Sequence, residues 1–349
     1  MPRLRRLRAG LPHAAQGDRG RATGQGEPTV PNAAVRRYPG NPVLTANDVP
    51  YKATLVFNAG VTKFQGRYVM VFRNDYGTWG VPRFEGTNLG LAFSDDGLRW
   101  RVEPKPCFEL HDAEITRAYD PRLTVLGGRV YMCFAVDTPH GVRGGIAVTD
   151  DFERFEILSL SVPDNRNMVL FPEKISGKYI RLERPFPVYS RGGGELFDIW
   201  LSESPDLRYW GNSDVVLTTR DVPFCNAKIG PAAPPIKTAK GWLTTFHAVD
   251  IDPARGKNGW EPAWRKRYTA GIMLLDLEDP RKVVGLCRQP LLVPEAPYEV
   301  DGGFRNHVVF PCGTILEDGG EVKVYYGAAD TVICLAVAHV DDLIRMCME

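Results

Sequence analysis

The sequence predicts an all-β protein, a five-bladed β-propeller. A glycine turn followed by a strand occurs five times along the chain, and an apolar run precedes and follows each copy. The glycines that open these strands are Gly66, Gly128, Gly177, Gly241 and Gly320, so the repeat recurs about every 64 residues. This period suits a propeller blade with its loops, and no long helical periodicity competes with it.

The central strand of each repeat is rich in β-branched and aromatic residues, which favour strands. In chain order the five copies read GRYVMVFRND, GRVYMCFAVD, GKYIRLERPF, GWLTTFHAVD and GEVKVYYGAAD. The runs before them are ATLVFNAGVTKF, AYDPRLTVL, NMVLFPEKI, AKIGPAAPPIKT and NHVVFPCGTIL, and the runs after them include LGLAFSDDGLRW and GGIAVTDDFERF. Each repeat therefore holds at least three strands. A stacked solenoid is the alternative, but its repeats usually span about 20 to 47 residues and are more regular.

The first 35 residues differ in composition from the rest of the chain. They are rich in Arg, Gly, Ala and Pro and contain no apolar run as long as a signal-peptide core. We therefore expect a disordered or peripheral tail over 1–35 and one propeller domain over 36–349. A transit peptide, or a start codon assigned too far upstream, are the alternative interpretations of the tail.

Composition and charge limit the classes of partner. The chain carries 43 basic and 42 acidic side chains, a formal net charge of +1, which argues against a nucleic-acid or membrane surface as the main partner. The sequence contains no run of about 18 apolar residues, so it predicts no transmembrane helix. The seven cysteines are odd in number, scattered and free of C-x-x-C pairs, so we expect reduced thiols, a cytoplasmic location and no metal site.

Polar residues recur at matching places in the repeats. Asn58 and Asp120 each lie eight residues before the glycine of their repeat, and Pro121 interrupts the strand that holds Asp120. Further polar residues of the inner runs and of the ends of the next strands are Arg166, Asn167, Lys174, Lys228, Asn306, Arg73, Asp75, Asp137, Arg184, His247, Asp250 and Asp330. Any one of them could simply close the channel of a propeller. A single carboxylate beside several cations instead predicts an anionic co-substrate such as phosphate.

Several segments resemble glycoside hydrolase family 130, the inverting β-mannoside phosphorylases. They are YKATLVFNAG, AYDPRLT, PDNRNMVLFPEKI, KIGPAAPPIKT, GWLTTFHAVD and YYGAADT, and the resemblance runs from about Asn41 to the C-terminus. It implies a five-bladed propeller in which Asp120 is the catalytic acid and Arg166, Asn167, Lys228 and His247 hold phosphate. It also places Asn58, Arg73, Asp75, Tyr119 and Asp330 around the mannosyl unit, and Arg83 near the acceptor sugar.

The resemblance also implies a reaction. Within the family the chain is most similar to members that act on 4-O-β-D-mannosyl-D-glucose, which would yield α-D-mannose 1-phosphate and glucose. In this family the acid reaches the glycosidic oxygen through the mannose 3-hydroxyl, and phosphate, already an anion, needs no second carboxylate to activate it. We expect no metal or organic cofactor and a homo-oligomer. The alternatives are a β-1,4-manno-oligosaccharide phosphorylase, a β-mannoside hydrolase and a non-catalytic glycan-binding propeller.

Overall fold

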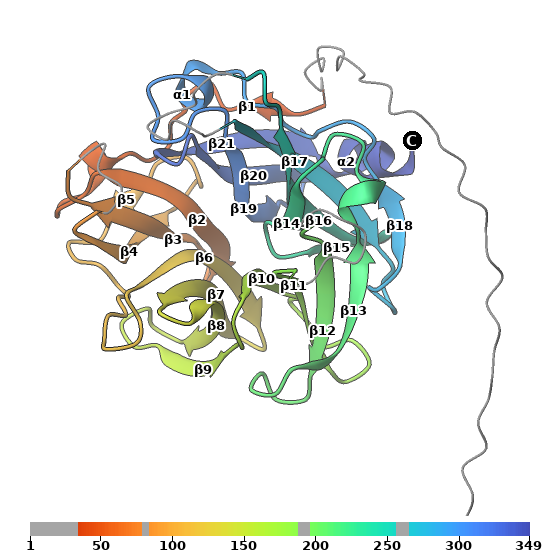
Figure 1. The fold of residues 1–349 in the computed structure, drawn as a ribbon, viewed down its shortest axis with the longest axis horizontal. Helices are drawn as coiled ribbons and strands as arrows, with labels where there is room; N and C mark the ends of the chain where they lie inside the picture. Colours follow the sequence, from red (N-terminus) through yellow and green to blue (C-terminus); the bar gives the residue numbers. More distant parts are fainter. Residues whose placement is uncertain (1–33, 79–83, 188–195, 256–264) are drawn as a thin grey trace, which may run out of the picture. The chain divides into compact units, whose positions relative to one another are not determined.

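Five sheets form the five blades of a β-propeller in the computed structural model, which confirms the predicted fold class (Figure 1). The structure describes residues 34–78, 84–187, 196–255 and 265–349. Blade 1 contains β2 (Leu55–Phe64), β3 (Arg67–Tyr76), β4 (Gly86–Ser94) and β5 (Arg101–Val102). Blade 2 contains β6 (Arg117–Leu126), β7 (Arg129–Thr138), β8 (Gly141–Thr149) and β9 (Glu156–Leu160).

The remaining blades repeat this order with small changes. Blade 3 contains β10 (Asn165–Leu170), β11 (Tyr179–Pro185), β12 (Ile199–Ser204) and β13 (Gly211–Leu217). Blade 4 contains β14 (Lys228–Pro231), β15 (Ile236–Thr238), β16 (Gly241–Ile251), β17 (Lys266–Leu275) and β18 (Val283–Leu286). Blade 5 contains β19 (Val309–Leu316), β20 (Glu321–Ala328), β21 (Val332–His339) and the N-terminal β1 (Arg36–Arg37). The helical elements among the described residues are η1 (Ala46–Asp48), η2 (Thr219–Asp221), α1 (Pro297–Val300) and α2 (Val340–Met348).

The repeated glycines form the turns that join the first two strands of a blade. Gly66 and Gly128 have φ angles of 78° and 79°, a region that glycine occupies without steric cost. The strands before these turns, β2 and β6, are the innermost of their blades and contact each other at the centre of the propeller. The repeat detected in the sequence is therefore the blade itself, and its first strand positions the central residues.

Three of the inner strands carry a bulge at the same place. The ladder of β6 pairs Tyr119 with Ala135 and resumes only at Arg122, so Asp120 and Pro121 pair with no residue of β7. Asp120 has a φ of 56°, and Asn58 of β2 and Asn167 of β10 occupy equivalent interruptions with φ angles of 49° and 60°. Asp and Asn tolerate this left-handed conformation better than most residues do. The bulge explains how a strand accommodates Pro121, which has no N–H to donate.

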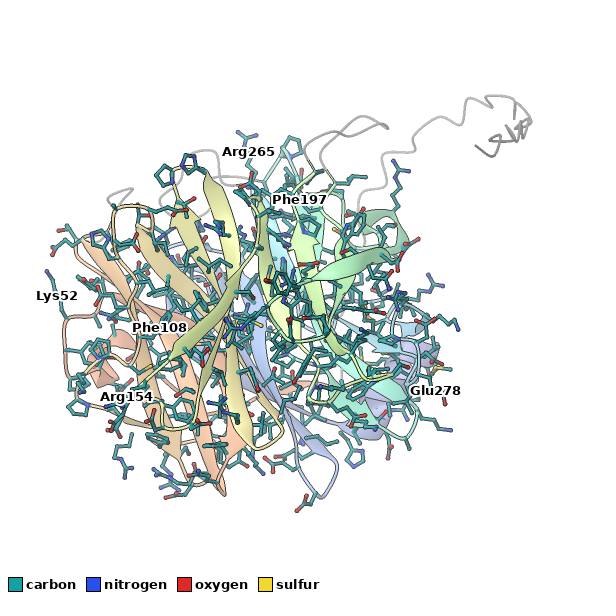
Figure 2. The ribbon with its side chains drawn as sticks, turned by 90° about the horizontal axis from the view of Figure 1, so that it is seen from below. Lys52, Phe108, Arg154, Phe197, Arg265 and Glu278 are labelled. Carbon is teal, nitrogen blue, oxygen red and sulfur yellow. The ribbon has the colours of Figure 1, made fainter. Side chains whose placement is uncertain are left out.

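Apolar side chains fill the spaces between blades. The largest cluster spans blades 3, 4 and 5 and includes the fully buried Trp242, while smaller clusters join blades 5 and 1 and blades 1 and 2. In the side view of Figure 2, Phe197 and Arg265 lie at one end of the blades, and Arg154 and Glu278 lie toward the other. The functional residues described below lie near Phe197, whose ring is 6.0 Å from the Lys228 ammonium.

Two further sequence predictions concern cysteines and helices. All seven cysteines lie within the described residues, and each is a free thiol. None of the helices described here is long and apolar enough to span a membrane. The predicted tail falls almost wholly on residues 1–33, outside the described ranges, so its disorder stays a prediction.

Candidate active site at the centre of the propeller

A small polar cavity of about 80 Å³ lies at the centre, with lining residues from all five blades. Blades 1 and 2 contribute a carboxylate and the groups that contact it, blades 3 and 4 contribute basic side chains, and blade 5 contributes a second carboxylate. The lining residues are Asn58, Arg73, Asp120, Arg166, Asn167, Arg184, His247, Tyr268, Arg305, Val308, Phe310 and Asp330.

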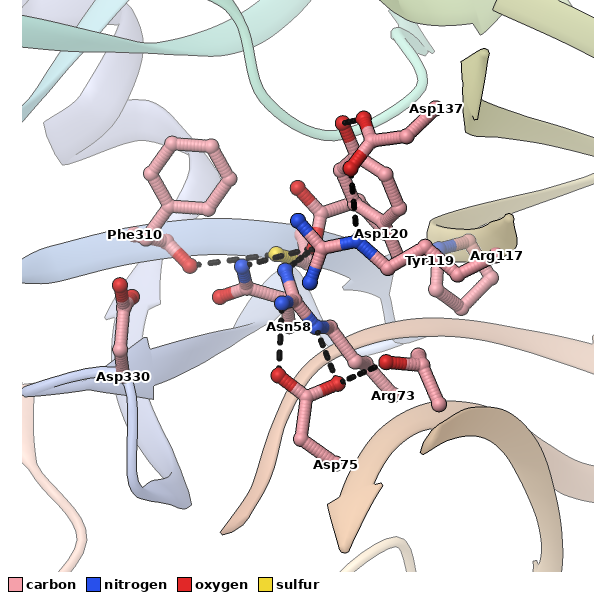
Figure 3. Close-up of polar contacts among 12 residues, drawn as sticks. Asn58, Arg73, Asp75, Arg117, Tyr119, Asp120, Asp137, Phe310 and Asp330 are labelled. Atoms are coloured by element: carbon pink, nitrogen blue, oxygen red, sulfur yellow. Dashed lines mark hydrogen bonds and ion pairs between the residues drawn. The ribbon is translucent and has the colours of Figure 1, made fainter. Parts of the chain in front are cut away.

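Asp120 lies between two donors from blade 1. Its Oδ1 accepts a hydrogen bond of 3.0 Å from the Asn58 amide nitrogen, and the same oxygen is 3.3 Å from the Arg73 guanidinium (Figure 3). Asn58 is only 4% exposed, so this contact is shielded from water. The bulges of β2 and β6 aim both side chains toward the axis, and this is why they meet.

Arg73 is fixed on several sides. It donates two hydrogen bonds to Asp75, of 2.9 and 2.7 Å, and the hydroxyl of Thr87 donates to the same carboxylate at 2.8 Å. The guanidinium also lies 4.5 Å from the ring of Phe57 and 4.8 Å from the ring of Tyr119. A planar cation stacked on rings and held by a bidentate carboxylate has little freedom to move. Arg73 therefore presents a fixed positive charge to Asp120.

The pKa values of the two carboxyl groups in the cavity are shifted in opposite directions. Burial raises the pKa of Asp120, but the guanidiniums of Arg73 and Arg122 and the hydrogen bond from Asn58 outweigh it, so the pKa is lowered. For Asp330, burial outweighs the attraction of Arg305, which lies 3.1 Å away, and the pKa is raised. Asp120 is therefore the more acidic of the two carboxyl groups.

Basic side chains gather on the other side of Asp120. Arg166 and Arg184 each have a buried Nε with no hydrogen-bond partner, and no ion pair joins either of them to a carboxylate among the described residues. One Arg184 nitrogen lies 3.0 Å from Nε2 of the fully buried His247. Because arginine only donates, Nε2 accepts, and the proton of a neutral His247 sits on Nδ1, which also has no partner. An anion can satisfy buried donors of this kind.

Burial and mutual repulsion lower the pKa values of these basic side chains. Burial, together with Arg184 and Arg166, lowers the pKa of Lys228 to about 6. Burial, followed by the nearby Arg166, lowers the pKa of Arg184 to about 9. Burial and the same cations lower the pKa of His247 well below its ordinary value, so His247 serves as a neutral donor and not as the cation expected from the sequence. A bound anion would relieve this repulsion.

A larger cavity of about 670 Å³ adjoins the central one and shares Arg73 and Arg305 with it. Part of its wall comes from blade 2, where Asp137 accepts hydrogen bonds from the Tyr119 hydroxyl at 2.6 Å and from Arg117 at 2.7 Å. Figure 3 shows this group beside Asp120. We call this space the outer cavity. Its position gives a leaving group or acceptor room next to the carboxylate.

Most of the site residues predicted from the sequence line the central cavity or the outer cavity. The central cavity is lined by Asn58, Arg73, Asp120, Arg166, Asn167, His247 and Asp330, and Asp75 lines the outer one. Tyr119 stacks on Arg73, and the Lys228 ammonium lies 5.3 Å from the ring of Tyr268. Arg83 lies outside the described residues. What each residue does in a reaction stays a prediction.

Some residues of the predicted polar ring lie elsewhere. The Lys174 ammonium covers the ring of Tyr179 at 4.3 Å, and Asp250 pairs with Arg255 and Arg267 at 2.6 and 2.8 Å. The side-chain oxygen of Asn306 accepts a hydrogen bond from a loop backbone nitrogen, that of Gly303. Position at a strand end was not sufficient to place them in the cavity.

The sequence prediction also omitted several lining residues. Arg184 was part of the predicted ring but was not assigned to phosphate, and Tyr268, Arg305 and Phe310 were not expected at all. Tyr268 is the third residue of β17 and lines the cavity. The strand pattern that contains it, RYTAGIMLL, was the available signal.

Known proteins resemble the chain along most of its length. The sequence profile of glycoside hydrolase family 130, described as beta-1,4-mannooligosaccharide phosphorylase, matches residues 25–349. The β-1,4-mannooligosaccharide phosphorylase of Ruminococcus albus is 32% identical over 333 residues, which are 92% of each chain. The 4-O-β-D-mannosyl-D-glucose phosphorylase of Bacteroides fragilis is 29% identical over 337 residues, covering 88% of this chain and 78% of that protein.

A solved structure provides the corresponding comparison in three dimensions. The complex of β-1,2-mannobiose phosphorylase from Listeria innocua with β-1,2-mannobiose superposes with a TM-score of 0.76 at 26% identity. The match covers 90% of this chain and 99% of that chain. This chain thus resembles both relatives that act on β-1,4-linked mannosides and relatives that act on β-1,2-linked mannosides.

Proposed function

The chain belongs to glycoside hydrolase family 130, a family of mannoside phosphorylases, and on this premise we propose that it cleaves a terminal β-1,4-mannosyl unit by phosphorolysis with inversion. One observation carries the proposal: buried basic groups, which form no ion pair with a carboxylate among the described residues, lie beside Asp120, whose pKa is lowered. A hydrolase that activates water needs a second carboxylate as base, whereas phosphate needs only to be held in line with the bond that breaks.

The proposed roles follow from this arrangement. Phosphate would occupy the donors of Arg166, Arg184, His247 and Lys228 and attack the anomeric carbon of the mannosyl unit. The transition state resembles an oxocarbenium ion, so the bound phosphate dianion would also stabilise its developing positive charge. Asp120 would supply the proton that the departing sugar oxygen needs, by way of the mannose 3-hydroxyl.

The proposal also accounts for the origin of that proton. Asp120 is ionised in the ligand-free protein because cations surround it. A phosphate dianion beside Arg166 would offset part of this positive charge and raise the pKa of Asp120. Phosphate binding would then favour the protonated acid, so the co-substrate would prepare the catalytic group.

The acceptor is the finer part of the proposal. We propose 4-O-β-D-mannosyl-D-glucose as substrate, with α-D-mannose 1-phosphate and glucose as products. A second candidate, a β-1,4-manno-oligosaccharide, is favoured by the relative from Ruminococcus albus, which is similar over 92% of both chains. An outer cavity of about 670 Å³ can hold more than one sugar unit and is compatible with both acceptors.

The test is an assay of phosphate-dependent cleavage. The enzyme is incubated with 4-O-β-D-mannosyl-D-glucose, β-1,4-mannobiose or β-1,2-mannobiose, with and without phosphate, and the products are followed by ³¹P and ¹H NMR. We expect α-mannose 1-phosphate from a β-1,4-linked substrate only when phosphate is present. Mannose release without phosphate would indicate a hydrolase, and sugar binding without turnover would indicate a glycan-binding propeller. A cytoplasmic location, the absence of a cofactor and homo-oligomerisation stay predictions.

A further inference from the structure

A second cavity of about 670 Å³ lies between blades 2 and 3, outside the site described above. One wall is the end of β9 with the segment Ser161–Asn165, and the other is the outer part of blade 3. The apolar cluster between these two blades is small and leaves this end of their interface to polar and aromatic side chains. We call this cavity the blade 2–3 groove.

The groove lies directly beside the outer cavity. Asp164 lines the outer cavity, where its Oδ1 accepts a hydrogen bond of 3.0 Å from the Val142 backbone, and the next residue, Asn165, lines the groove. Consecutive Cα atoms are about 3.8 Å apart, so only the thickness of one chain separates the two spaces. Val162, on the groove side of this segment, is 78% exposed. A chain that leaves the outer cavity over this segment reaches the groove.

The floor of the groove contains a buried polar cluster. Glu183 is 4% exposed and accepts hydrogen bonds from Asn165 at 2.7 Å and from Ser202, and Arg181 pairs with it at 2.7 Å. Burying an ion pair between blades costs desolvation energy that apolar side chains would not. Two atoms of the cluster still lack partners, the acceptor Asn165 Oδ1 and the donor Arg181 Nε.

Aromatic side chains complete the groove. Tyr209 is 76% exposed, Trp200 lines the cavity, and the ring of Trp210 lies 4.2 Å from the Arg181 guanidinium. Aromatic faces beside hydrogen-bonding groups suit a ligand with both apolar and polar surfaces. A sugar ring offers C–H faces and hydroxyls that donate and accept, which match the aromatic side chains and the polar lining residues Ser161, Asp198 and Arg208. An anion in the groove would instead be repelled by the carboxylate of Glu183.

We propose that the blade 2–3 groove binds the distal sugar units of a β-linked mannoside chain whose cleaved end occupies the central site. The inference rests on the proposed function and extends it to long substrates. The groove would add affinity only for long chains, the second substrate candidate named above, since a disaccharide ends in the outer cavity and cannot reach it.

The test compares short and long substrates in groove variants. Tyr209→Ala and Trp200→Ala are combined, and kcat/KM is measured for β-1,4-mannohexaose and for 4-O-β-D-mannosyl-D-glucose. We expect the value for the hexaose to fall about tenfold and the value for the disaccharide to stay unchanged. Val284→Ala, at a residue of blade 4 that is 42% exposed, is the control and should change neither. Equal values for the hexaose in the double variant and the control would overturn the inference.

Direct binding separates this inference from the proposed function. Calorimetry of mannohexaose with the inactive Asp120→Asn background should show weaker binding when Tyr209→Ala and Trp200→Ala are added, whether or not the wild type uses phosphate. Undiminished binding would overturn the groove assignment while leaving phosphorolysis intact. A change of oligomeric state in sedimentation, with sugar binding unchanged, would overturn it in favour of a contact between copies of the chain.

Discussion

At the scale of single residues, the proposed role of Asp120 as the acid depends on its protonation. Asn58 and Arg73 hold its carboxylate in the charged form, which cannot donate a proton. The same contacts fix its position, so neutralising the side chain without changing its shape separates chemistry from structure.

We predict that Asp120→Asn slows phosphorolysis of the natural disaccharide by about 10²- to 10⁴-fold, the usual contribution of general acid catalysis. A mannosyl donor with a good leaving group, such as mannosyl fluoride or an aryl mannoside, needs little protonation and should lose much less. Both rates are measured at saturating phosphate, with near-ultraviolet circular dichroism as the folding control. Equal losses for both donors would make Asp120 a binding residue.

We expect Lys228 to give the proposed anion site its pH dependence. Its pKa is about 6 in the folded protein and near 10.5 when unfolded, because burial and neighbouring cations disfavour the charge. The folded state binds fewer protons than the unfolded state between these values, so stability of the ligand-free protein rises with pH across this window. A bound dianion favours the charged lysine and so binds more tightly at the lower pH.

We therefore predict that sulfate, which stays a dianion over this range, raises the Tm of the wild type more at pH 6 than at pH 8. Lys228→Met should raise the Tm of the ligand-free protein at pH 6 and abolish the pH dependence of the sulfate effect. Lys228→Arg keeps a charge and should retain a sulfate effect at both pH values. Scanning calorimetry tests all three, and an equal sulfate effect in wild type and Lys228→Met would rule out Lys228 as part of the anion site.

Residue-level inference from the sequence succeeded where the repeats align without insertions. Asn58 and Asp120 stand at the same offset from their glycines, and the structure brings them within 3.0 Å. Asn167 lies ten residues before Gly177 because its turn is longer, so counting did not reveal that it occupies the third equivalent bulge. The cavity-lining Arg305 lies in a loop before β19, where no repeat predicts a position.

At the scale of elements, the inner strands form the site and the second strands support it. The β-branched and aromatic runs predicted that the central strands exist. The fourth strands, such as the two-residue β5, have too few residues to show periodicity. The bulges also escaped prediction, because the sequence marks only one of them with proline. Close packing between β14 and β16 is another feature that periodicity does not encode.

Gly230 of β14 pairs with His247 of β16. A Cβ added there would lie 2.5 Å from Cε1 and 2.8 Å from Nε2 of His247, and 3.1 Å from Cδ of Arg184. We predict that Gly230→Ala displaces the histidine, raises the KM for phosphate and destabilises the fold by about 1–3 kcal/mol, a typical cost of overpacking. Gly211→Ala is the matched control, since a Cβ there meets no atom within 4 Å. Phosphate kinetics and urea unfolding should separate the two, and an unchanged phosphate KM in Gly230→Ala would contradict the packing account.

At the scale of the whole molecule, the ring of blades closes through the N-terminal segment. β1 pairs with β21, so blade 5 combines strands from both ends of the described chain (Figure 1). Asn41 adds two hydrogen bonds of 2.8 Å to the backbone of Leu335. The sequence predicted five repeats but not which segment supplies the last strand, because Arg36–Arg37 are too short to show a pattern.

Arg37 anchors this closure. It donates to both oxygens of Glu299 at 2.8 and 2.9 Å and to the Val293 carbonyl at 2.6 Å, while the Tyr326 hydroxyl donates to Glu299 at 2.8 Å. Glu299 is fully buried. Without Arg37, its carboxylate would remain buried without a cation, a loss that typically costs about 3–5 kcal/mol. The closure therefore depends on a pair whose two members lie at opposite ends of the chain.

We predict that Arg37→Ala lowers the free energy of unfolding by about 3–5 kcal/mol. Arg36→Ala, at the exposed neighbouring position of the same strand, should change it by no more than about 0.5 kcal/mol. Arg37→Met combined with Glu299→Gln removes both charges, so the double variant should be more stable than Arg37→Ala alone. Urea unfolding followed by tryptophan fluorescence measures all three. If Arg37→Ala were as stable as Arg36→Ala, the ring would be closed by backbone pairing and the Asn41 hydrogen bonds, and the buried ion pair would contribute nothing to it.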